Sequence, residues 1–480
     1  MQKYNTLADY FSKHATSSKF VFEIETGKKK SHKEILDNAK KLVTNFQIRK
    51  GEIVTIILPN SIEYIEYFIA SMLGGWVFNP LPYFIQTQEL NKILKYIESN
   101  IVITDKEEIF SCFSKKYKIF APRQILSKNE KFIKMEINPN EAVALYYSSG
   151  TTDNPKGIIY SHNNMVSLIS SIVRGFKFTS SDRHLAFLPF GHTASINYNI
   201  LPSLFVGCDL FISKGFEHLR NIFFNVLEKY RITYTEIVPT VLFVLNKLKV
   251  NIGSMNFSQL KFIGCGSSSL PLSAQKEFIK QYGIAVGNLY GLSETGPTHI
   301  DNPREEGWKP GSIGVPLDVN ECRISEDGEL IIKGENVFIG YHKNKQLYKE
   351  TVVNGWFHTG DLGEYHDGKF YFSDRKKDII IKGAINIVPK EIEEVIHEHP
   401  AVLECVVVSK VDKIHGEDIA VVAVKNGDIS DEKLAQEIKD LCHSRFSSYK
   451  VPCHIEFWES IPKTSSKKLL RKKVRELINR

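Results

Sequence analysis

The chain has 480 residues, 42% hydrophobic and 24% charged, which is typical of a folded globular protein too long for one hydrophobic core. We therefore expect at least two domains. A net charge of +7 is modest for this length and is concentrated in the tail 462–480, which lacks the interleaved aromatic residues of single-strand binders, so no nucleic-acid partner is expected. Seven well-separated cysteines without a CxxC pair argue against a zinc site or a disulfide framework and favour a reducing, cytoplasmic location.

Export and membrane signals are weak. The start, "MQKYNTLADYF", lacks the basic and then apolar pattern of a secretory signal. The most apolar window, 67–81, contains glycines and is shorter than the roughly 20 residues that a membrane-spanning helix needs. We expect a buried core helix there and no membrane span.

The first two thirds of the chain alternate strand and helix patterns. The run "IVTIIL" at 53–58 predicts a buried strand, and 61–72 predicts the helix that follows it. The pattern recurs, with further strands expected at 101–104, 142–147, 235–238 and 261–264. This alternation predicts an α/β fold in which a large N-terminal domain has mainly parallel sheets.

After about residue 311 the pattern changes to short strands joined by Asp-Gly turns. The segments 326–334 and 366–375 predict β-hairpins, which form a small β-rich part. A smaller α+β unit follows, with helices from Pro389 and Asp431 and strands near 405–408 and 419–424. We expect an N-terminal domain at 1–374, a hinge at 375–377 and a mobile C-terminal domain at 378–480.

The segment "YYSSGTTDNPKG" at 146–157 combines hydroxyls, glycines and a lysine, which together can bind an anion such as phosphate. It is not a Walker loop, because Pro155 precedes Lys156 and Gly157 follows it. Taken alone, it could also be an ordinary Ser/Thr-rich turn.

Five further segments follow in a fixed order: "LPFGHTAS" at 188–195, "LYGLSETG" at 289–296, "GWFHTGDLG" at 355–363, "DRKKDIIIKGAINIVPKEIE" at 374–393 and "PKTSSKKLLR" at 462–471. With the phosphate-type loop, they resemble the adenylate-forming superfamily of acyl- and aryl-CoA synthetases, adenylation domains and luciferases. The resemblance covers essentially the whole chain. It implies that ATP and a carboxylic acid give an acyl-adenylate and pyrophosphate, after which a thiol displaces AMP.

The resemblance assigns roles to several residues. The phosphate loop would be lined by Ser148, Ser149, Gly150, Thr151, Thr152 and Lys156. Glu294 would hold Mg²⁺, a hard cation that prefers carboxylate oxygens, although alone it would be read as a solvated loop residue. The adenine and phosphates would lie near Tyr290, Gly291, Ser293, Gly266 and Ser267. Asp361 would accept hydrogen bonds from both ribose hydroxyls, with Arg375 nearby.

Four more positions bear on catalysis by the same resemblance. Lys468 would bridge the acid and the α-phosphate, and Lys377 would act as the hinge about which the small domain moves. His192 matches a gating histidine beside the carboxylate, although a structural role is a simpler reading of a lone histidine. A neutral Thr193 stands where relatives that activate amino acids carry Asp, which argues against an α-amino acid.

Three common family glycines are replaced, by Asp153, Ala384 and Lys467. Asp153 would repel phosphates unless it faces solvent or pairs with Lys156. Ala384, after Gly383, adds a methyl group beside the expected thiol passage. These changes leave adenylation better supported than thioester formation.

The sequence therefore predicts a carboxylic acid–thiol ligase that uses ATP, Mg²⁺ and coenzyme A. One alternative is a stand-alone enzyme that loads the phosphopantetheine of an acyl or peptidyl carrier protein. Another is a degenerate regulator that binds nucleotide or acyl-adenylate without turnover. The acid, aliphatic or aryl, cannot be read from the motifs because pocket volume sets it.

Overall fold

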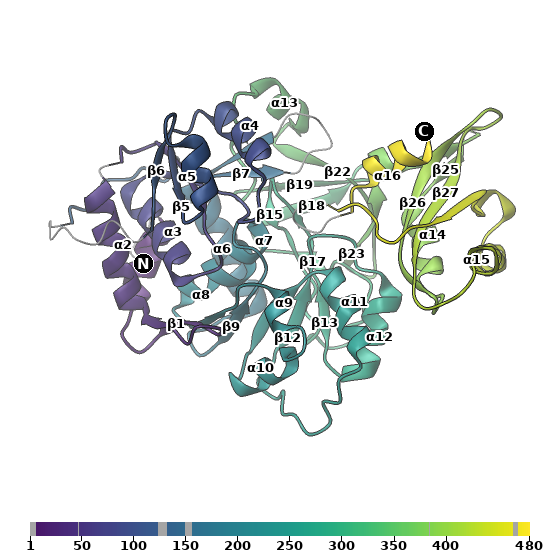
Figure 1. The fold of residues 1–480 in the computed structure, drawn as a ribbon, viewed down its shortest axis with the longest axis horizontal. Helices are drawn as coiled ribbons and strands as arrows, with labels where there is room; N and C mark the ends of the chain where they lie inside the picture. Colours follow the sequence, from purple (N-terminus) through teal and green to yellow (C-terminus); the bar gives the residue numbers. More distant parts are fainter. Residues whose placement is uncertain (1–5, 47, 123–131, 149–155, 384, 464–468) are drawn as a thin grey trace.

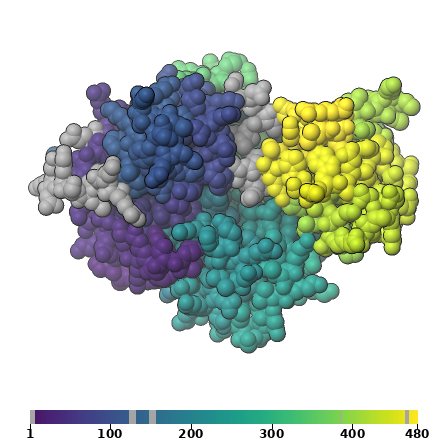
Figure 2. All heavy atoms as spheres, in the orientation of Figure 1, coloured from purple at the N-terminus to yellow at the C-terminus, as the bar shows by residue number. Residues whose placement is uncertain are grey.

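The computed structural model describes residues 6–46, 48–122, 132–148, 156–383, 385–463 and 469–480. Two seven-stranded sheets and a β-rich sheet form the larger part of the molecule, and residues after about 380 form a smaller lobe beside it (Figures 1 and 2). This is the expected α/β architecture with a smaller α+β lobe. The exact domain limits remain a prediction.

The first large sheet contains the strand predicted from "IVTIIL" and has the order β20-β8-β7-β4-β3-β5-β6. Its strands are β3 (Ile53–Ile57), β4 (Val77–Pro80), β5 (Ile101–Thr104), β6 (Lys118–Phe120), β7 (Ala142–Ser148), β8 (Lys156–Ser161) and β20 (Gly340–Tyr341). The pairs from β7 to β6 are parallel, whereas β8 and β20 add antiparallel strands at the edge. Lys156, at the start of β8, therefore lies on the side of the sheet that β20 extends.

The second large sheet has the order β13-β12-β11-β9-β10-β1-β2 and is parallel except for β2. Its strands are β1 (Phe20–Glu23), β2 (Lys29–Ser31), β9 (Arg183–Ala186), β10 (Asp209–Ile212), β11 (Tyr234–Ile237), β12 (Phe262–Cys265) and β13 (Val286–Asn288). The expected strands at 235–238 and 261–264 are confirmed to within one residue at each end.

Helices cover both large sheets. They are α1 (Leu7–His14), α2 (His32–Phe46), α3 (Ile62–Gly74), α4 (Thr87–Ile97), α5 (Glu107–Phe113), α6 (His162–Phe176), α7 (Thr193–Ser195), the π-helix η1 (Ile196–Ile200), α8 (Leu201–Val206), α9 (Phe216–Leu219), α10 (Phe223–Lys229), α11 (Pro239–Leu248) and α12 (Leu272–Tyr282). One hydrophobic core joins α3, α6 and α8 to strands of both sheets. A second core packs α10, α11 and α12 on the other face of the β9–β13 sheet.

The apolar window 67–81 is buried, but only its first part is the expected helix: α3 ends at Gly74, and the strand β4 begins at Val77. Helix α3 starts after Ser61, whose side chain accepts a hydrogen bond from the Tyr64 amide, and is capped by Gly75 in the left-handed conformation. Nearly every residue in it is buried. Across the described ranges, no helix combines the length and apolarity that a bilayer span requires.

The predicted hairpins form the β-rich sheet. It contains β18 (Asn320–Ile324), β19 (Glu329–Gly334), β21 (Val352–Val353), β22 (Trp356–His366) and β23 (Lys369–Arg375), with α13 (Lys345–Thr351) beside it. Asp367 and Gly368 both have positive φ in the turn between β22 and β23, as a tight Asp-Gly hairpin requires. Short pairs join β14 (Gly291–Leu292) to β15 (Gly296–Pro297) and β16 (His299–Ile300) to β17 (Val315–Pro316).

The smaller lobe follows the 3₁₀ turn η2 (Lys376–Asp378). Its sheet contains β24 (Ile380–Lys382), β25 (Ile385–Ile387), β26 (Val402–Asp412), β27 (Gly416–Lys425) and β28 (His454–Phe457). Helices α14 (Pro389–Ile396) and α15 (Asp431–Arg445) pack on one face of the sheet, and α16 (Arg471–Ile478) packs on the other, while η3 (Ser448–Lys450) precedes β28. The two predicted helices are confirmed, and the predicted strands are the centres of longer ones.

Candidate active site

Tyr290, Asp361 and Arg375 meet although they lie in three separate segments. The Tyr290 hydroxyl donates a hydrogen bond to Asp361 Oδ2 at 2.8 Å, and Arg375 Nε lies 3.2 Å from Asp361 Oδ1. Tyr290 and Asp361 are buried, whereas the Arg375 side chain is 48% exposed. A buried carboxylate is thus held by one hydroxyl and one guanidinium, with the guanidinium open to solvent.

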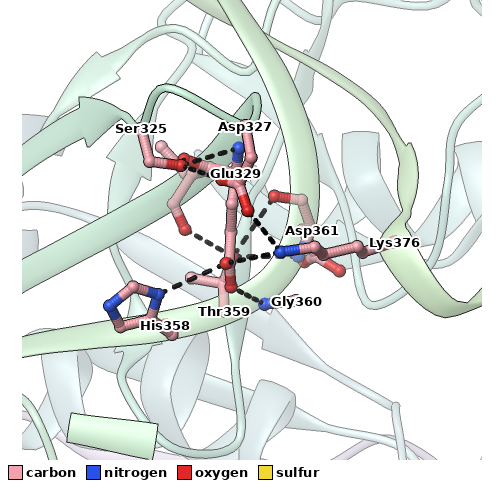
Figure 3. Close-up of polar contacts among 9 residues, drawn as sticks. Ser325, Asp327, Glu329, His358, Thr359, Gly360, Asp361 and Lys376 are labelled. Atoms are coloured by element: carbon pink, nitrogen blue, oxygen red, sulfur yellow. Dashed lines mark hydrogen bonds and ion pairs between the residues drawn. The ribbon is translucent and has the colours of Figure 1, made fainter. Parts of the chain in front are cut away.

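Glu329 shapes the turn that precedes Asp361. Its Oε1 accepts a hydrogen bond from the Gly360 amide at 2.7 Å, and its Oε2 lies 3.3 Å from His358 Nδ1 and 3.5 Å from Lys376 Nζ (Figure 3). Glu329 is buried at the start of β19, so it links the hairpin strand to the Asp361 segment. Figure 3 also shows Lys376 bridging from Glu329 to the more exposed Asp327.

Glu294 is held from the edge strand β20. The Tyr341 hydroxyl donates a hydrogen bond to Glu294 Oε1 at 3.0 Å, and the Glu294 carbonyl accepts one from the Phe338 amide at 2.9 Å. The preceding carbonyl, that of Ser293, accepts a hydrogen bond from Tyr160 in β8 at 2.8 Å. The "LYGLSETG" segment is therefore fixed to the sheet that carries Lys156.

Electrostatic interactions join these groups into one site. Burial, the largest effect, raises the pKa of Glu294, while the Tyr341 hydrogen bond, Lys156 and Arg375 oppose that rise. The Asp361 charge raises the pKa of Arg375. Burial, followed by Arg375, lowers the pKa of Lys377, with a smaller contribution from Lys156. Cations from β8, β23 and η2 thus lie within electrostatic range of one another and of two carboxylates.

Two backbone features narrow the space around Tyr290. The backbone at Gly291 and at Gly266 lies so close to other backbone that a side chain would clash. A Cβ at Gly291 would lie 2.3 Å from the Gly296 carbonyl oxygen, and a Cβ at Gly266 would lie 2.9 Å from the carbonyl oxygen of Leu289, which precedes Tyr290. Ser267 has φ +69°, a left-handed conformation that costs a non-glycine residue on the order of 1 kcal/mol. Tight backbone approaches of this kind are common where a loop contacts a ligand.

His192 caps the short helix α7. Its Nδ1 accepts a hydrogen bond from the Ala194 amide at 3.4 Å, and the side chain is partly buried. Thr193 begins the same helix and is also partly buried. The cap fits the simpler structural reading of His192 and does not test the gating role.

The remaining predicted positions lie in the first large sheet, in or near the smaller lobe, or outside the described residues. Lys377 is in η2, and Gly383 follows β24 with φ +54°, close to His415. Ser148 ends β7. Outside the described residues lie Ser149, Gly150, Thr151, Thr152, Ala384 and Lys468, together with Asp153 and Lys467.

Sequence reasoning missed three positioning residues: Tyr160, Tyr341 and Glu329. None belongs to the motif that it supports. Tyr341 reaches Glu294 across 47 positions, and Glu329 reaches Gly360 across 31. Their only sequence signal is membership of short strands, which many other tyrosines and glutamates share.

Comparison with known proteins places this arrangement in a family. Residues 12–342 match the AMP-binding enzyme family, and residues 391–468 match the AMP-binding enzyme C-terminal domain. A 2-succinylbenzoate–CoA ligase of Bacillus cereus (strain Q1) is 30% identical over 452 residues, which cover 91% of this chain and 90% of that one. A long-chain-fatty-acid–CoA ligase of Bacillus subtilis (strain 168) is 29% identical over 517 residues, covering 94% and 90%.

Solved structures of similar enzymes share the fold of this chain. The O-succinylbenzoate coenzyme A synthetase of Bacillus subtilis in complex with AMP superposes with a TM-score of 0.86 at 26% identity, covering 97% of this chain and 98% of that one. An anthranilate CoA ligase in complex with anthranoyl-AMP has the same fold, with a TM-score of 0.90 at 21% identity, covering 100% and 98%. The chain therefore belongs to the AMP-binding, adenylate-forming enzyme family.

Proposed function

We propose that this protein is an AMP-forming carboxylic acid–thiol ligase, which first makes an acyl-adenylate and then transfers the acyl group to a thiol. The observation that carries the proposal is the convergence of Tyr290, Asp361 and Arg375 with Glu294 and Lys156. This set contains a buried carboxylate that can accept hydrogen bonds from a diol, a second carboxylate, and two cationic side chains that can bind an anion. It matches the needs of a nucleoside triphosphate.

The first step requires one anion to attack another. A substrate carboxylate oxygen forms a bond to the α-phosphorus of ATP while the bond from that phosphorus to the pyrophosphate oxygen breaks. Arg375, Lys156 and Lys468 would offset the negative charge that gathers during the attack. Asp361 would accept hydrogen bonds from the ribose hydroxyls, with its carboxylate held by Tyr290.

Glu294 suits a hard divalent cation. Its carboxylate is anchored through Oε1 by Tyr341, and carboxylate oxygens are the ligands that Mg²⁺ prefers. When bound, Mg²⁺ neutralises charge on the phosphate oxygens and on the departing pyrophosphate. Tyr341 would orient the Glu294 carboxylate toward it.

We propose coenzyme A as the thiol acceptor, because the two curated relatives compared above are both named as CoA ligases. Their acids differ, one a succinylbenzoate and the other a long-chain fatty acid, so their names do not fix the acid used here. A carrier-protein phosphopantetheine is the competing acceptor. The free thiols suit a cytoplasmic location, which we propose on that basis.

We also propose that the lobe after residue 378 moves about the segment 375–377, with Lys377 as the hinge and Lys468 entering the site for the first step. Contacts across this junction support a defined pose: the Lys390 amide donates to Asp374 Oδ2 at 2.8 Å, and Lys390 Nζ donates to the Phe372 carbonyl at 2.7 Å. In the second step, the thiol would pass near Gly383 and Ala384.

Pyrophosphate exchange tests the proposal. Purified protein with ATP, Mg²⁺ and a broad panel of carboxylic acids should exchange labelled pyrophosphate into ATP with at least one acid. Lys468→Ala should reduce that exchange by at least a hundredfold, whereas its neighbour variant Lys467→Ala should keep it within a fewfold. Unchanged exchange in Lys468→Ala would overturn the mechanism.

The acceptor is tested separately. With an accepted acid and ATP, free coenzyme A and a holo-carrier protein are offered in parallel, and the thioester is measured. Coenzyme A should yield the thioester faster. Nucleotide binding without exchange for any acid would instead favour a non-catalytic regulator.

A further inference from the structure

Glu236 is a buried carboxylate with no hydrogen-bond partner among the residues that the structure describes. It lies in β11 and is 1% exposed, and neither carboxylate oxygen has a hydrogen-bond partner within the described part of the chain. The four other buried glutamates there each accept a hydrogen bond: Glu23, Glu66, Glu329 and Glu393. Glu236 is therefore the exception among buried glutamates, and its missing partner needs a physical reason.

More unpaired polar atoms lie on the elements around Glu236. The π-helix η1 contacts β11, and π-helices are rare and are often found at functional sites. Buried atoms without a described partner are Ser195 Oγ, Asn197 Oδ1, Asn199 Oδ1 and the Tyr234 hydroxyl. Tyr234 also lies on the same face of β11 as Glu236, two residues away.

Glycines, not polar side chains, flank Glu236 in the sheet. Its neighbour in register on β12 is Gly264, and the next in that row on β13 is Gly287. Neither glycine has a side chain to bond the carboxylate, and the Leu289 side chain and the Tyr234 hydroxyl lie over Gly264. The aromatic groups that interact electrostatically with Glu236 are Tyr198 and Tyr234.

This region adjoins the proposed acid site. Helix η1 follows directly after the His192–Ser195 segment. At its other side, a Cβ at Gly296 of the "LYGLSETG" segment would lie 3.2 Å from Asn197 Nδ2. Helix η1 thus contacts both β11, which carries Glu236, and β15 of the "LYGLSETG" segment, and it continues directly from the His192–Ser195 segment.

Burying such a group without a partner is unfavourable. Desolvation raises the pKa of Glu236 well above its ordinary value, which favours the neutral acid in the folded protein. A neutral acid still leaves hydrogen-bonding capacity unused, at a cost that an apolar residue would avoid. Such a residue lowers the stability of the ligand-free protein, and this cost has a reason if a bound ligand supplies the missing hydrogen-bond partner.

We propose that Glu236 determines substrate specificity, and that the acid activated by this enzyme carries an amino or hydroxyl group, away from its reacting carboxylate, that donates a hydrogen bond to Glu236. This inference rests on the proposed function.

Matched acids test the proposal. Two series are compared by kcat/KM in pyrophosphate exchange: straight-chain acids of four to eight carbons with methyl, hydroxymethyl or aminomethyl ends, and benzoates with or without a hydroxyl or amino group. In at least one series, the donor-bearing acid should exceed its unsubstituted partner by tenfold or more. Ratios within twofold throughout both series would overturn the proposal.

Variants assign the effect to Glu236. Glu236→Leu should lower kcat/KM for the donor-bearing acid at least tenfold and raise it for the unsubstituted one. Glu236→Gln separates the two donors: a hydroxyl preference should survive within a fewfold, whereas an amino preference should be lost with the charge. A preference unchanged in Glu236→Leu would contradict the assignment.

Thermal unfolding provides a readout independent of activity. Without ligand, Glu236→Leu should have a higher Tm than the wild type, because it removes an unpaired buried polar group. The matched variant Glu66→Leu should have a lower Tm, since Glu66 is buried but bonded to Lys30 and Asn38. A lower Tm for Glu236→Leu would reveal a structural partner and overturn the proposal.

The experiments distinguish failure of the proposed ligase function from failure of the proposed role of Glu236. If no acid in any panel supports exchange, the proposed ligase function fails, and the specificity inference fails with it. If acids are activated but donor-bearing acids gain nothing, only the role of Glu236 fails.

Discussion

The Tyr290 hydroxyl donates a 2.8 Å hydrogen bond to Asp361, which lies 71 residues later in the chain. This contact joins the loop after β13 to the long strand β22, and Arg375 completes it from β23. In the proposed function, this contact would present a carboxylate that is already oriented before nucleotide arrives. Preorganisation of this kind lowers the cost of ordering groups on binding.

Removal of that hydroxyl should weaken nucleotide binding. Tyr290→Phe leaves Asp361 buried without this donor, and a hydrogen bond to a charged group contributes about 1.5–3 kcal/mol. We expect the KM for ATP to rise about tenfold or more in pyrophosphate exchange. Tyr365→Phe is the control, because Tyr365 lies on the same strand but is 59% exposed, and its KM should match the wild type.

The Glu329 contacts should matter for the turn before Asp361. Glu329→Ala leaves the Gly360 amide without its carboxylate acceptor, and we expect a loss of about 1–3 kcal/mol in the free energy of unfolding in urea. The KM for ATP should rise as well. Asp327→Ala removes the exposed partner of Lys376, which also contacts Glu329, and should leave the free energy of unfolding nearly unchanged. Equal effects of the two variants would refute a special role for Glu329.

The Ala384 position should limit the second half-reaction. Ala384→Gly introduces the glycine that the family resemblance predicts at this position, and we expect faster thioester formation from preformed acyl-adenylate, with pyrophosphate exchange unchanged. A tenfold gain would correspond to about 1.4 kcal/mol of relieved steric cost. The opposite variant, Gly383→Ala, forces a residue with φ +54° to carry a side chain and should slow the same step. No change in Ala384→Gly would exclude the methyl group as an obstacle.

Glu236 should make stability fall as pH rises. Its folded pKa lies above the ordinary value of 4.5, so the unfolded chain releases the proton first as pH increases. Stability contributed by the bound proton is present below that value and is lost above it, by up to about 1.4 kcal/mol for each pH unit until the folded pKa is reached. Tyr198, Tyr234 and Cys265, the groups that interact electrostatically with Glu236, stay neutral there, because burial raises the pKa of each.

Urea unfolding at several pH values measures this effect. The stability advantage of Glu236→Gln over the wild type should grow between pH 5 and pH 8. Glu326→Gln, at an exposed position, should show no such trend. A constant difference across this pH range would mean that Glu236 does not retain its proton on folding.

Strand and helix positions were largely readable from the sequence because burial imposes local patterns. A parallel strand buried on both faces is a continuous apolar run, which located β3, β5 and β11 to within one residue. Asp-Gly turns located the β22–β23 hairpin, since few other residues accept positive φ at both positions. The strands of the smaller lobe were underestimated, because β26 extends beyond the apolar run to Asp412 and β27 begins at Gly416, before the apolar run starts, so these ends carry no continuous apolar pattern.

The sequence by itself determined the fold class and the order of the chemistry-bearing motifs, because hydrophobic periodicity, turn residues and motif spacing are properties of adjacent positions. Only the tertiary structure decided which residues support those motifs. Tyr341 is bonded to Glu294 and Glu329 to Gly360, and in each pair the two residues lie in segments far apart in the chain. The lack of a partner for Glu236 among the described residues is likewise a property of the folded chain. Sequence separation conceals such relations because chain folding, not spacing, sets the distance between these atoms.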